Sequence, residues 1–91
     1  MYVVVFYDIS SNRVRQLVAD KLLSKGLARV QRSVFIGRGG YALAKDLARY
    51  LTRFINPGDS LLIMVVPRDS VMGMIRLGDS VSLNEQRVKL L

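Results

Sequence analysis

The residues able to do chemistry in this chain are mainly carboxylates, because its 91 residues include no histidine and no cysteine. Their absence excludes zinc sites built on imidazole or thiolate, cysteine and histidine nucleophiles, and the usual general base. The remaining candidates are Asp8, Asp20, Asp46, Asp59, Asp69, Asp79 and Glu85. Asp20 and Asp46 fall inside predicted helices, and Asp59 follows the turn sequence Pro57-Gly58. Asp8 alone ends a predicted central strand, so it is the first candidate for a functional carboxylate.

Asp8 closes the apolar run Tyr2-Val3-Val4-Val5-Phe6-Tyr7, and a charge in that position needs a compensating partner. Two interpretations stay equally open: an Asx-turn or cap for the following helix, or a functional ligand. Mg²⁺ and Mn²⁺ take oxygen ligands and need only one or two carboxylates together with waters and substrate phosphates. A two-fold dimer would add a second Asp8 across its axis, giving a site for metal-assisted phosphodiester hydrolysis.

The net charge of +7, from 14 Lys and Arg against 7 Asp and Glu, predicts an anionic partner. Nucleic acid is the first candidate and an acidic membrane surface the second. The basic groups favour contact with the phosphate backbone over reading of bases. They are Arg13 and Arg15 at the start of the first helix, Arg29 and Arg32 around the second strand, and Lys45, Arg49 and Arg53 on the second helix.

No membrane insertion is expected, because the apolar runs at 2–7 and 61–66 are far too short to span a bilayer. No basic segment precedes the first run, so it lacks the form of a signal peptide. The lack of cysteine is compatible with a reducing compartment, and we therefore expect a cytoplasmic protein.

The predicted elements follow the order β-α-β-β-α-β with an extension, which is the plan of the ferredoxin-like α+β fold. Apolar runs predict strands at 2–7 and 61–66, and helical spacing of apolar residues predicts helices at 12–25 and 41–55. Between them, 28–38 predicts two short strands meeting near Arg32-Ser33, with one longer bent strand as the alternative. A further short strand is predicted at 74–78. We assign 1–80 to one domain and 81–91 to a C-terminal extension, either an edge strand or a mobile tail.

Self-association is expected from the two long strands, which are apolar on both faces although helices cover only one face of such a sheet. The strand at 61–66 also lies at a sheet edge in this topology, and an apolar edge invites pairing. We therefore predict a homodimer in which the C-terminal extension adds a strand at an edge.

Several motifs resemble the small CRISPR-associated endonuclease family, the second of the two universal Cas proteins and the partner of the CRISPR integrase. They are Tyr7-Asp8-Ile9-Ser10 closing the first strand, Arg15 in the first helix, and the run from Arg29 to Gly37. The match is specific over 2–37 and looser to about Gly78. It departs at Leu17, where the family often has a basic residue, which makes Arg13 the candidate substitute.

The resemblance implies a ferredoxin-like homodimer whose two Asp8 side chains face each other across a cleft and hold one Mg²⁺. It implies metal-dependent cleavage of single-stranded RNA or double-stranded DNA, and a bridging role with the integrase in spacer acquisition. Tyr7, Arg15, Arg29 and Phe35 match residues linked in the family to activity or substrate placement.

Two main hypotheses follow. In the first, the chain is an endonuclease in which Asp8 binds the metal while Arg15 and Arg29 position phosphate. In the second, it is a non-catalytic scaffold that bridges integrase dimers and binds duplex DNA through Lys45, Arg49 and Arg53. A ribonuclease toxin on the same fold is a related third possibility.

Overall fold

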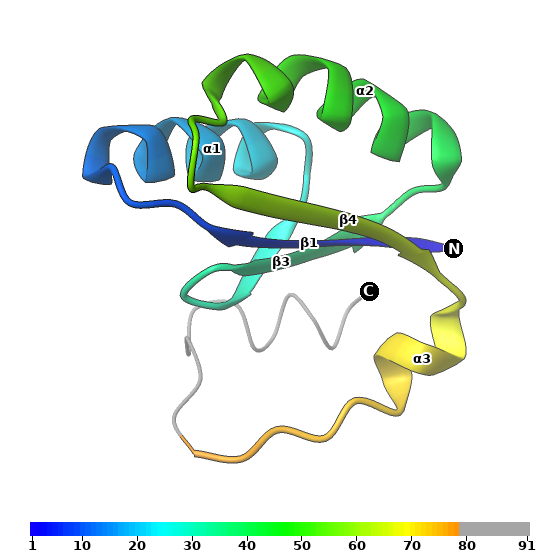
Figure 1. Ribbon diagram of the computed structural model, residues 1–91. Helices are drawn as coiled ribbons and strands as arrows, with labels where there is room; N and C mark the ends of the chain where they lie inside the picture. The colour runs from blue at the N-terminus through cyan, green and yellow to red at the C-terminus, as the bar shows by residue number, and fades with distance from the viewer. Residues whose placement is uncertain (79–91) are drawn as a thin grey trace.

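The computed structural model describes residues 1–78, which form one antiparallel sheet with helices on both of its faces. The strands are β1 (Tyr2–Asp8), β2 (Ala28–Gln31), β3 (Val34–Arg38) and β4 (Ser60–Val66). The helical elements are α1 (Asn12–Ser24), α2 (Tyr41–Leu51), the 3-10 turn η1 (Thr52–Phe54) and α3 (Arg68–Met72). The strand order β2-β3-β1-β4 confirms the ferredoxin-like α+β prediction. Figure 1 shows α1 and α2 on one face and α3 on the other.

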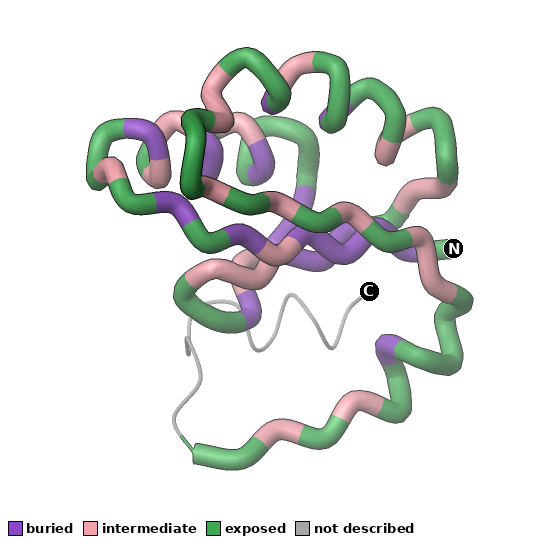
Figure 2. The backbone as a smooth tube through the Cα atoms, viewed as in Figure 1, coloured by how far each residue is buried: buried purple, intermediate pink, exposed green. Residues whose placement is uncertain are grey.

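Strand β1 lies at the centre of the sheet and is buried on both faces, as its continuous apolar run predicts (Figure 2). Toward α1 and α2, its side chains Val3, Val5 and Tyr7 join the main core. Toward the opposite face, Tyr2 and Val4 join a smaller cluster. The partners in the main core include Val18, Leu22, Leu27, Phe35, Leu47 and Leu51, and those in the smaller cluster include Val30, Ile36 and Val71.

The segment 28–38 forms the predicted pair of strands, and the alternative of one longer bent strand is wrong. Strands β2 and β3 pair antiparallel, with an irregularity between Arg29 and Gln31. The hairpin packs closely against the chain before it: a Cβ added at Gly37 would lie 2.7 Å from Leu27 Cγ. Only glycine therefore fits at this position of β3 without movement of Leu27.

The predicted strand at 74–78 is wrong, because the chain forms α3 just before it and no regular element from Met74 to Gly78. Pro67 ends β4, with φ −69 and ψ 159, and precedes the first turn of α3. Val71 then packs on the smaller cluster, so burial of one apolar side chain accompanies the helix. The predicted helix at 41–55 is also shortened, since α2 gives way to η1 at Thr52. The extension 81–91 lies outside the described residues.

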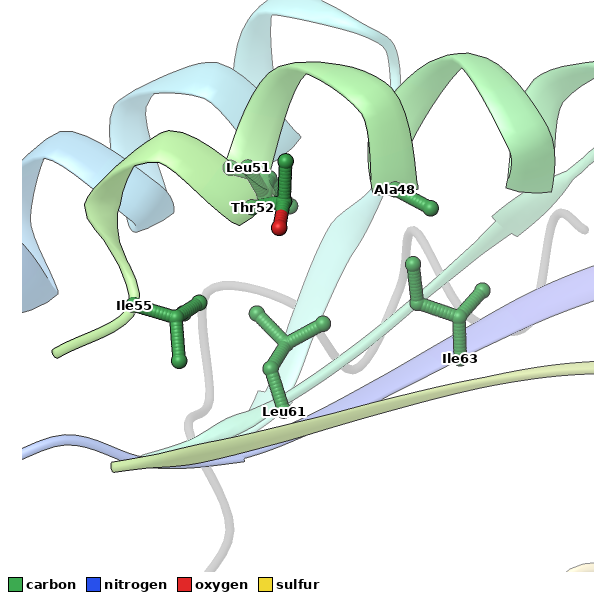
Figure 3. Close-up of a pocket in the computed structure, with 6 residues that line it drawn as sticks. All are labelled: Ala48, Leu51, Thr52, Ile55, Leu61 and Ile63. Atoms are coloured by element: carbon green, nitrogen blue, oxygen red, sulfur yellow. The ribbon is translucent and has the colours of Figure 1, made fainter. Parts of the chain in front are cut away.

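Strand β4 is an edge of the sheet, as predicted, and its two faces differ. Facing away from α1 and α2, Leu62 is 65% exposed and Met64 45% exposed. On the helical side, a groove of about 360 Å³ separates β4 from the end of α2 (Figure 3). It is lined by Ala48, Leu51, Thr52, Ile55, Leu61 and Ile63. No helix of residues 1–78 is long and apolar enough to cross a membrane.

Candidate functional site

Asp8 is the last residue of β1, and its carboxylate is exposed to solvent. Its backbone is fixed opposite Ser60 in the β1–β4 ladder. The N-cap of α1 is Ser11, whose Oγ accepts from the Val14 N–H at 3.2 Å, so the interpretation of Asp8 as the helix cap is wrong. Among the described residues the Asp8 carboxylate has no hydrogen-bond partner, which leaves both oxygens available to a ligand.

Arg15, predicted to contact phosphate, uses one nitrogen to hold the chain after Asp8. Its Nη1 donates to the carbonyl oxygen of Ile9 at 2.7 Å and to that of Ser10 at 3.0 Å. These two carbonyls belong to the β1–α1 connection and lie outside any ladder or helix. Charged donors make strong bonds to such acceptors, so Arg15 fixes the loop, and the same residue also lines the two adjacent cavities.

Two cavities meet beside this loop and share Arg15 and Arg32 on their walls. The first, of about 420 Å³, is lined by Asp8, Ile9, Arg15, Arg32 and Ser33. The second, of about 280 Å³, is lined by Tyr7, Asn12, Arg15, Gln16, Arg29 and Arg32. The walls of the first cavity therefore combine a carboxylate with two guanidinium groups. The walls of the second combine three guanidinium groups with two carboxamides. Both compositions suit a phosphate, and the first also suits a divalent cation.

Tyr7, Arg29 and Phe35 form one stack between β1 and the β2–β3 hairpin. The rings of Tyr7 and Phe35 lie 6.2 Å apart between centroids with an interplanar angle of 24°. The Arg29 guanidinium lies 4.9 Å from the Phe35 centroid, within cation–π range. Arg29 Nε is buried and makes no hydrogen bond to a described residue. Phe35 is fully buried, so it supports Arg29 and Tyr7 and does not itself contact a substrate.

The structure thus places Tyr7, Asp8, Arg15, Arg29 and Phe35, the residues to which the resemblance points, in or beside the two adjoining cavities. Arg13 is exposed and lines neither of the two cavities. Sequence reasoning noted Arg32 only as one of a basic pair, although it lines both cavities. Arg32 comes just before the second strand of the hairpin, and this position in the sequence could have predicted that it lies near the end of β1. The remaining polar wall residues, Asn12, Gln16 and Ser33, carried no such signal.

Lys45, Arg49 and Arg53, here called the α2 basic stripe, are exposed and line neither cavity. Arg49 pairs with Asp46 at 3.4 Å. The Arg53 guanidinium lies 4.7 Å from the Tyr50 centroid, and Lys21 of α1 lies 3.9 Å from the same centroid. Lys21 therefore extends the stripe from α2 onto α1.

The donor set around Asp8 fits one half of a Mg²⁺ or Mn²⁺ site. No group of three or more His, Cys, Asp or Glu side chains occurs among residues 1–78 that would enclose a metal ion. Asp8 supplies a hard oxygen ligand with both oxygens unengaged, which is one of the one or two carboxylates that such ions use beside waters and phosphate. A second copy of Asp8 would supply the other.

Comparisons with known proteins identify the family and the fold of the chain. Residues 1–74 match the family described as CRISPR associated protein Cas2. A CRISPR-associated endoribonuclease Cas2 from Aeropyrum pernix is 47% identical over 81 residues, covering 88% of each chain. A Cas1/Cas2 endonuclease fusion from Thermoproteus tenax is 42% identical over 78 residues, 85% of this chain and 30% of the fusion. The crystal structure of Streptococcus pyogenes Cas2 at pH 6.5 aligns with a TM-score of 0.73 and 26% identity, covering 86% of this chain and 100% of that chain.

Proposed function

The chain belongs to the CRISPR-associated Cas2 family, and from this membership we propose that it is a metal-dependent endonuclease acting on RNA or DNA phosphodiesters in the cytoplasm. The observation that carries the proposal is the Asp8 carboxylate, which is exposed, free of hydrogen bonds to described residues and adjacent to Arg15 and Arg32 in one cavity. A surface carboxylate placed against guanidinium groups without pairing to them is suited to hold a cation between itself and a bound phosphate.

In this proposal the side chains have separate tasks. Asp8 holds the Mg²⁺ or Mn²⁺ ion, which when bound activates water and neutralises charge on the phosphate. Arg32 and the free N–H groups of Arg15 bind the scissile phosphate in the cavity that also contains Asp8. Arg29, whose guanidinium lies over the Phe35 ring, binds the neighbouring phosphate in the second cavity, beside Tyr7.

The site is proposed to be completed by a second copy of the chain, because one Asp8 is half of a metal site. Exposed apolar side chains on β4, on α3 and on the segment after α3 support a homodimer. They are Leu62, Met64, Met72, Ile75 and Leu77. We expect sedimentation at micromolar concentration to give a dimer, with Leu62→Glu shifting it toward monomer; a wild-type monomer would contradict this part of the proposal.

The test of the nuclease compares wild type with Asp8→Asn on single-stranded RNA and on duplex DNA, each with Mg²⁺ and with a chelator. The substitution keeps the size of the side chain and removes its charge. We expect cleavage by wild type with Mg²⁺ only, and none by Asp8→Asn. Asp46→Asn, an equal charge change on α2, is the control and should cleave as wild type does. Cleavage that survives the chelator or the Asp8 substitution would show that another site is responsible.

A second candidate function is a scaffold that binds duplex DNA and the integrase Cas1. The relative from Thermoproteus tenax joins Cas1 and Cas2 in one chain, which favours association of the two proteins. The α2 basic stripe offers a surface for the duplex that does not use Asp8. We expect co-elution of this chain with the Cas1 protein of the same organism, unaffected by Asp8→Asn. Separate elution at micromolar concentrations would contradict the scaffold.

A further inference from the structure

The turn before β4 is tied to the loop that follows Asp8 through one side chain, Asp59. Asn56, Pro57, Gly58 and Asp59 form a tight turn in which the Asp59 N–H donates to the Asn56 carbonyl at 2.9 Å, with Gly58 at φ +91. The carboxylate of Asp59 then bridges two segments. Its Oδ2 accepts from the Asn56 N–H at 3.1 Å, and its Oδ1 accepts from the Ser10 N–H at 3.2 Å.

Closure of the turn uses only one of these oxygens. The other reaches a residue 49 positions away in the sequence, two residues after the proposed metal ligand. A turn-forming aspartate in a surface loop has no need for that bond. Its presence indicates that the turn also serves to hold the β1–α1 loop.

Together with Arg15, Asp59 leaves the chain after Asp8 little freedom. Asp8 itself pairs with Ser60, the residue directly after Asp59. The Ser10 peptide groups are then held on both sides, its N–H by Asp59 and its carbonyl by Arg15. Because the Asp8 side chain makes no hydrogen bond to a described residue, the backbone around it is what fixes the position of its Cα and the direction of its Cα–Cβ bond.

We propose that Asp59 is a positioning residue for Asp8: through the Ser10 N–H it fixes the loop that aims the Asp8 carboxylate at the divalent cation. This inference rests on the proposed function, since it requires that Asp8 bind the ion. Asp59 touches neither metal nor phosphate in this proposal. Partners that orient a metal ligand typically change metal affinity by about 10- to 100-fold when removed. Asp59 acts on the backbone and not on the ligand's side chain, so we expect about 10-fold, the lower end of that range.

Mn²⁺ binding to the full chain, measured by the electron paramagnetic resonance signal of free Mn²⁺, tests the inference without any cleavage assay. The variants are Asp8→Asn, Asp59→Ala and Asp59→Asn, with Asp46→Asn as the control for loss of one surface carboxylate. In Asp59→Asn the negative charge is gone and one acceptor oxygen remains, which we expect to accept from the Ser10 N–H while the Asn56 N–H loses its side-chain partner. Exchange of the Ser10 amide hydrogen reports whether the bond itself is present.

We expect Mn²⁺ affinity to fall about 10-fold in Asp59→Ala and to stay near wild type in Asp59→Asn and Asp46→Asn. Ser10 amide exchange should be faster in Asp59→Ala alone. Equal losses of Mn²⁺ affinity in Asp59→Ala and Asp59→Asn, with slow Ser10 amide exchange retained in Asp59→Asn, would overturn the inference, because charge and not position would then be responsible. If Asp59→Ala does not fold, Asp59→Ser replaces it, since its short hydroxyl cannot bridge Asn56 and Ser10 together.

The failures of the two proposals are distinguishable in the same experiment. Wild-type affinity in Asp8→Asn would refute the metal site at Asp8, and the role of Asp59 with it. Loss of binding in Asp8→Asn together with wild-type binding in Asp59→Ala would refute the role of Asp59 alone.

Discussion

The stack of Arg29 on Phe35 makes a quantitative prediction about stability that a double-mutant cycle can test. Phe35 is fully buried, while Arg29 is half-buried with its guanidinium 4.9 Å from the ring centroid. The perturbations are Phe35→Leu, which keeps an apolar side chain but removes the ring face, and Arg29→Met, which keeps a long apolar stem but removes the cation. If the two side chains act as a unit, their effects on the free energy of unfolding will not add.

The expected magnitudes follow from burial and geometry. Phe35→Leu should cost about 2–3 kcal/mol, from lost apolar burial and an imperfectly filled core. Arg29→Met should cost no more than about 1 kcal/mol, because it also removes a buried Nε that has no described partner. Cation–π contacts contribute about 0.5–1 kcal/mol when exposed and about 2 kcal/mol when desolvated, so this half-buried pair should couple by about 1 kcal/mol. The double variant is then more stable than the sum of the single effects predicts.

The free energy of unfolding of wild type, the two single variants and the double variant is measured in urea. All four are studied at the same protein concentration, since the stability of a dimer depends on concentration. Phe54→Leu combined with Arg29→Met provides the matched control, because Phe54 pairs with Tyr50 and not with Arg29. The control cycle should be additive within about 0.3–0.5 kcal/mol. Coupling of Phe35 with Arg29 no larger than in the control would refute the claim that the ring holds the guanidinium.

Three further predictions concern the fold and the helical surface. Gly37→Ala should destabilise by about 1–3 kcal/mol in urea, because the added Cβ would lie 3.0 Å from the Leu27 Cα, whereas Gly40→Ala meets nothing within 4 Å and should change stability far less. Ser11→Ala removes the N-cap of α1 and should cost about 1 kcal/mol by thermal unfolding; an unchanged midpoint would mean that the cap contributes nothing. Replacing the α2 basic stripe with glutamine should make the salt dependence of duplex binding shallower by about 2.7 in log–log slope, and an unchanged slope would remove the stripe from the interface.

The architecture was predictable because the strongest sequence patterns coincide with the elements that make the most contacts. The valine-rich run of β1 occupies the centre of the sheet, where both faces are buried. Helix α3 was not predicted, because its five residues are too few to show a periodic pattern of apolar side chains. Its formation depends on Val71 reaching the face of the sheet that α1 and α2 leave open, which is a tertiary condition.

At the candidate site, residue types pointed to Asp8 and the family resemblance pointed to Arg15 and Arg29, but the separate tasks of these side chains depend on contacts that the sequence does not show. Arg15 was predicted to bind phosphate, yet its Nη1 donates hydrogen bonds to the carbonyl oxygens of Ile9 and Ser10. Asp59 was predicted to be a turn residue, and its Oδ2 does accept a hydrogen bond within the turn. Its Oδ1, however, accepts a hydrogen bond from the Ser10 N–H of the β1–α1 loop. The Arg15 bonds stay within the β1–α1 connection, whereas the Asp59 bond depends on β4 lying antiparallel to β1, which brings residues 59 and 60 beside 8–10.

The same pairing restrains the backbone at the end of β1 that carries Asp8, the proposed metal ligand. Loops are mobile when their backbone groups bond only to water. Here the ladder between β1 and β4 continues to Asp8 and Ser60, and side-chain bonds to Ile9 and Ser10 carry the restraint to the cap of α1 at Ser11. Asp8 therefore stands on a fixed backbone while its side chain stays free of competing partners among residues 1–78. That combination favours ligand binding, because ordering of the loop is complete before the ligand arrives.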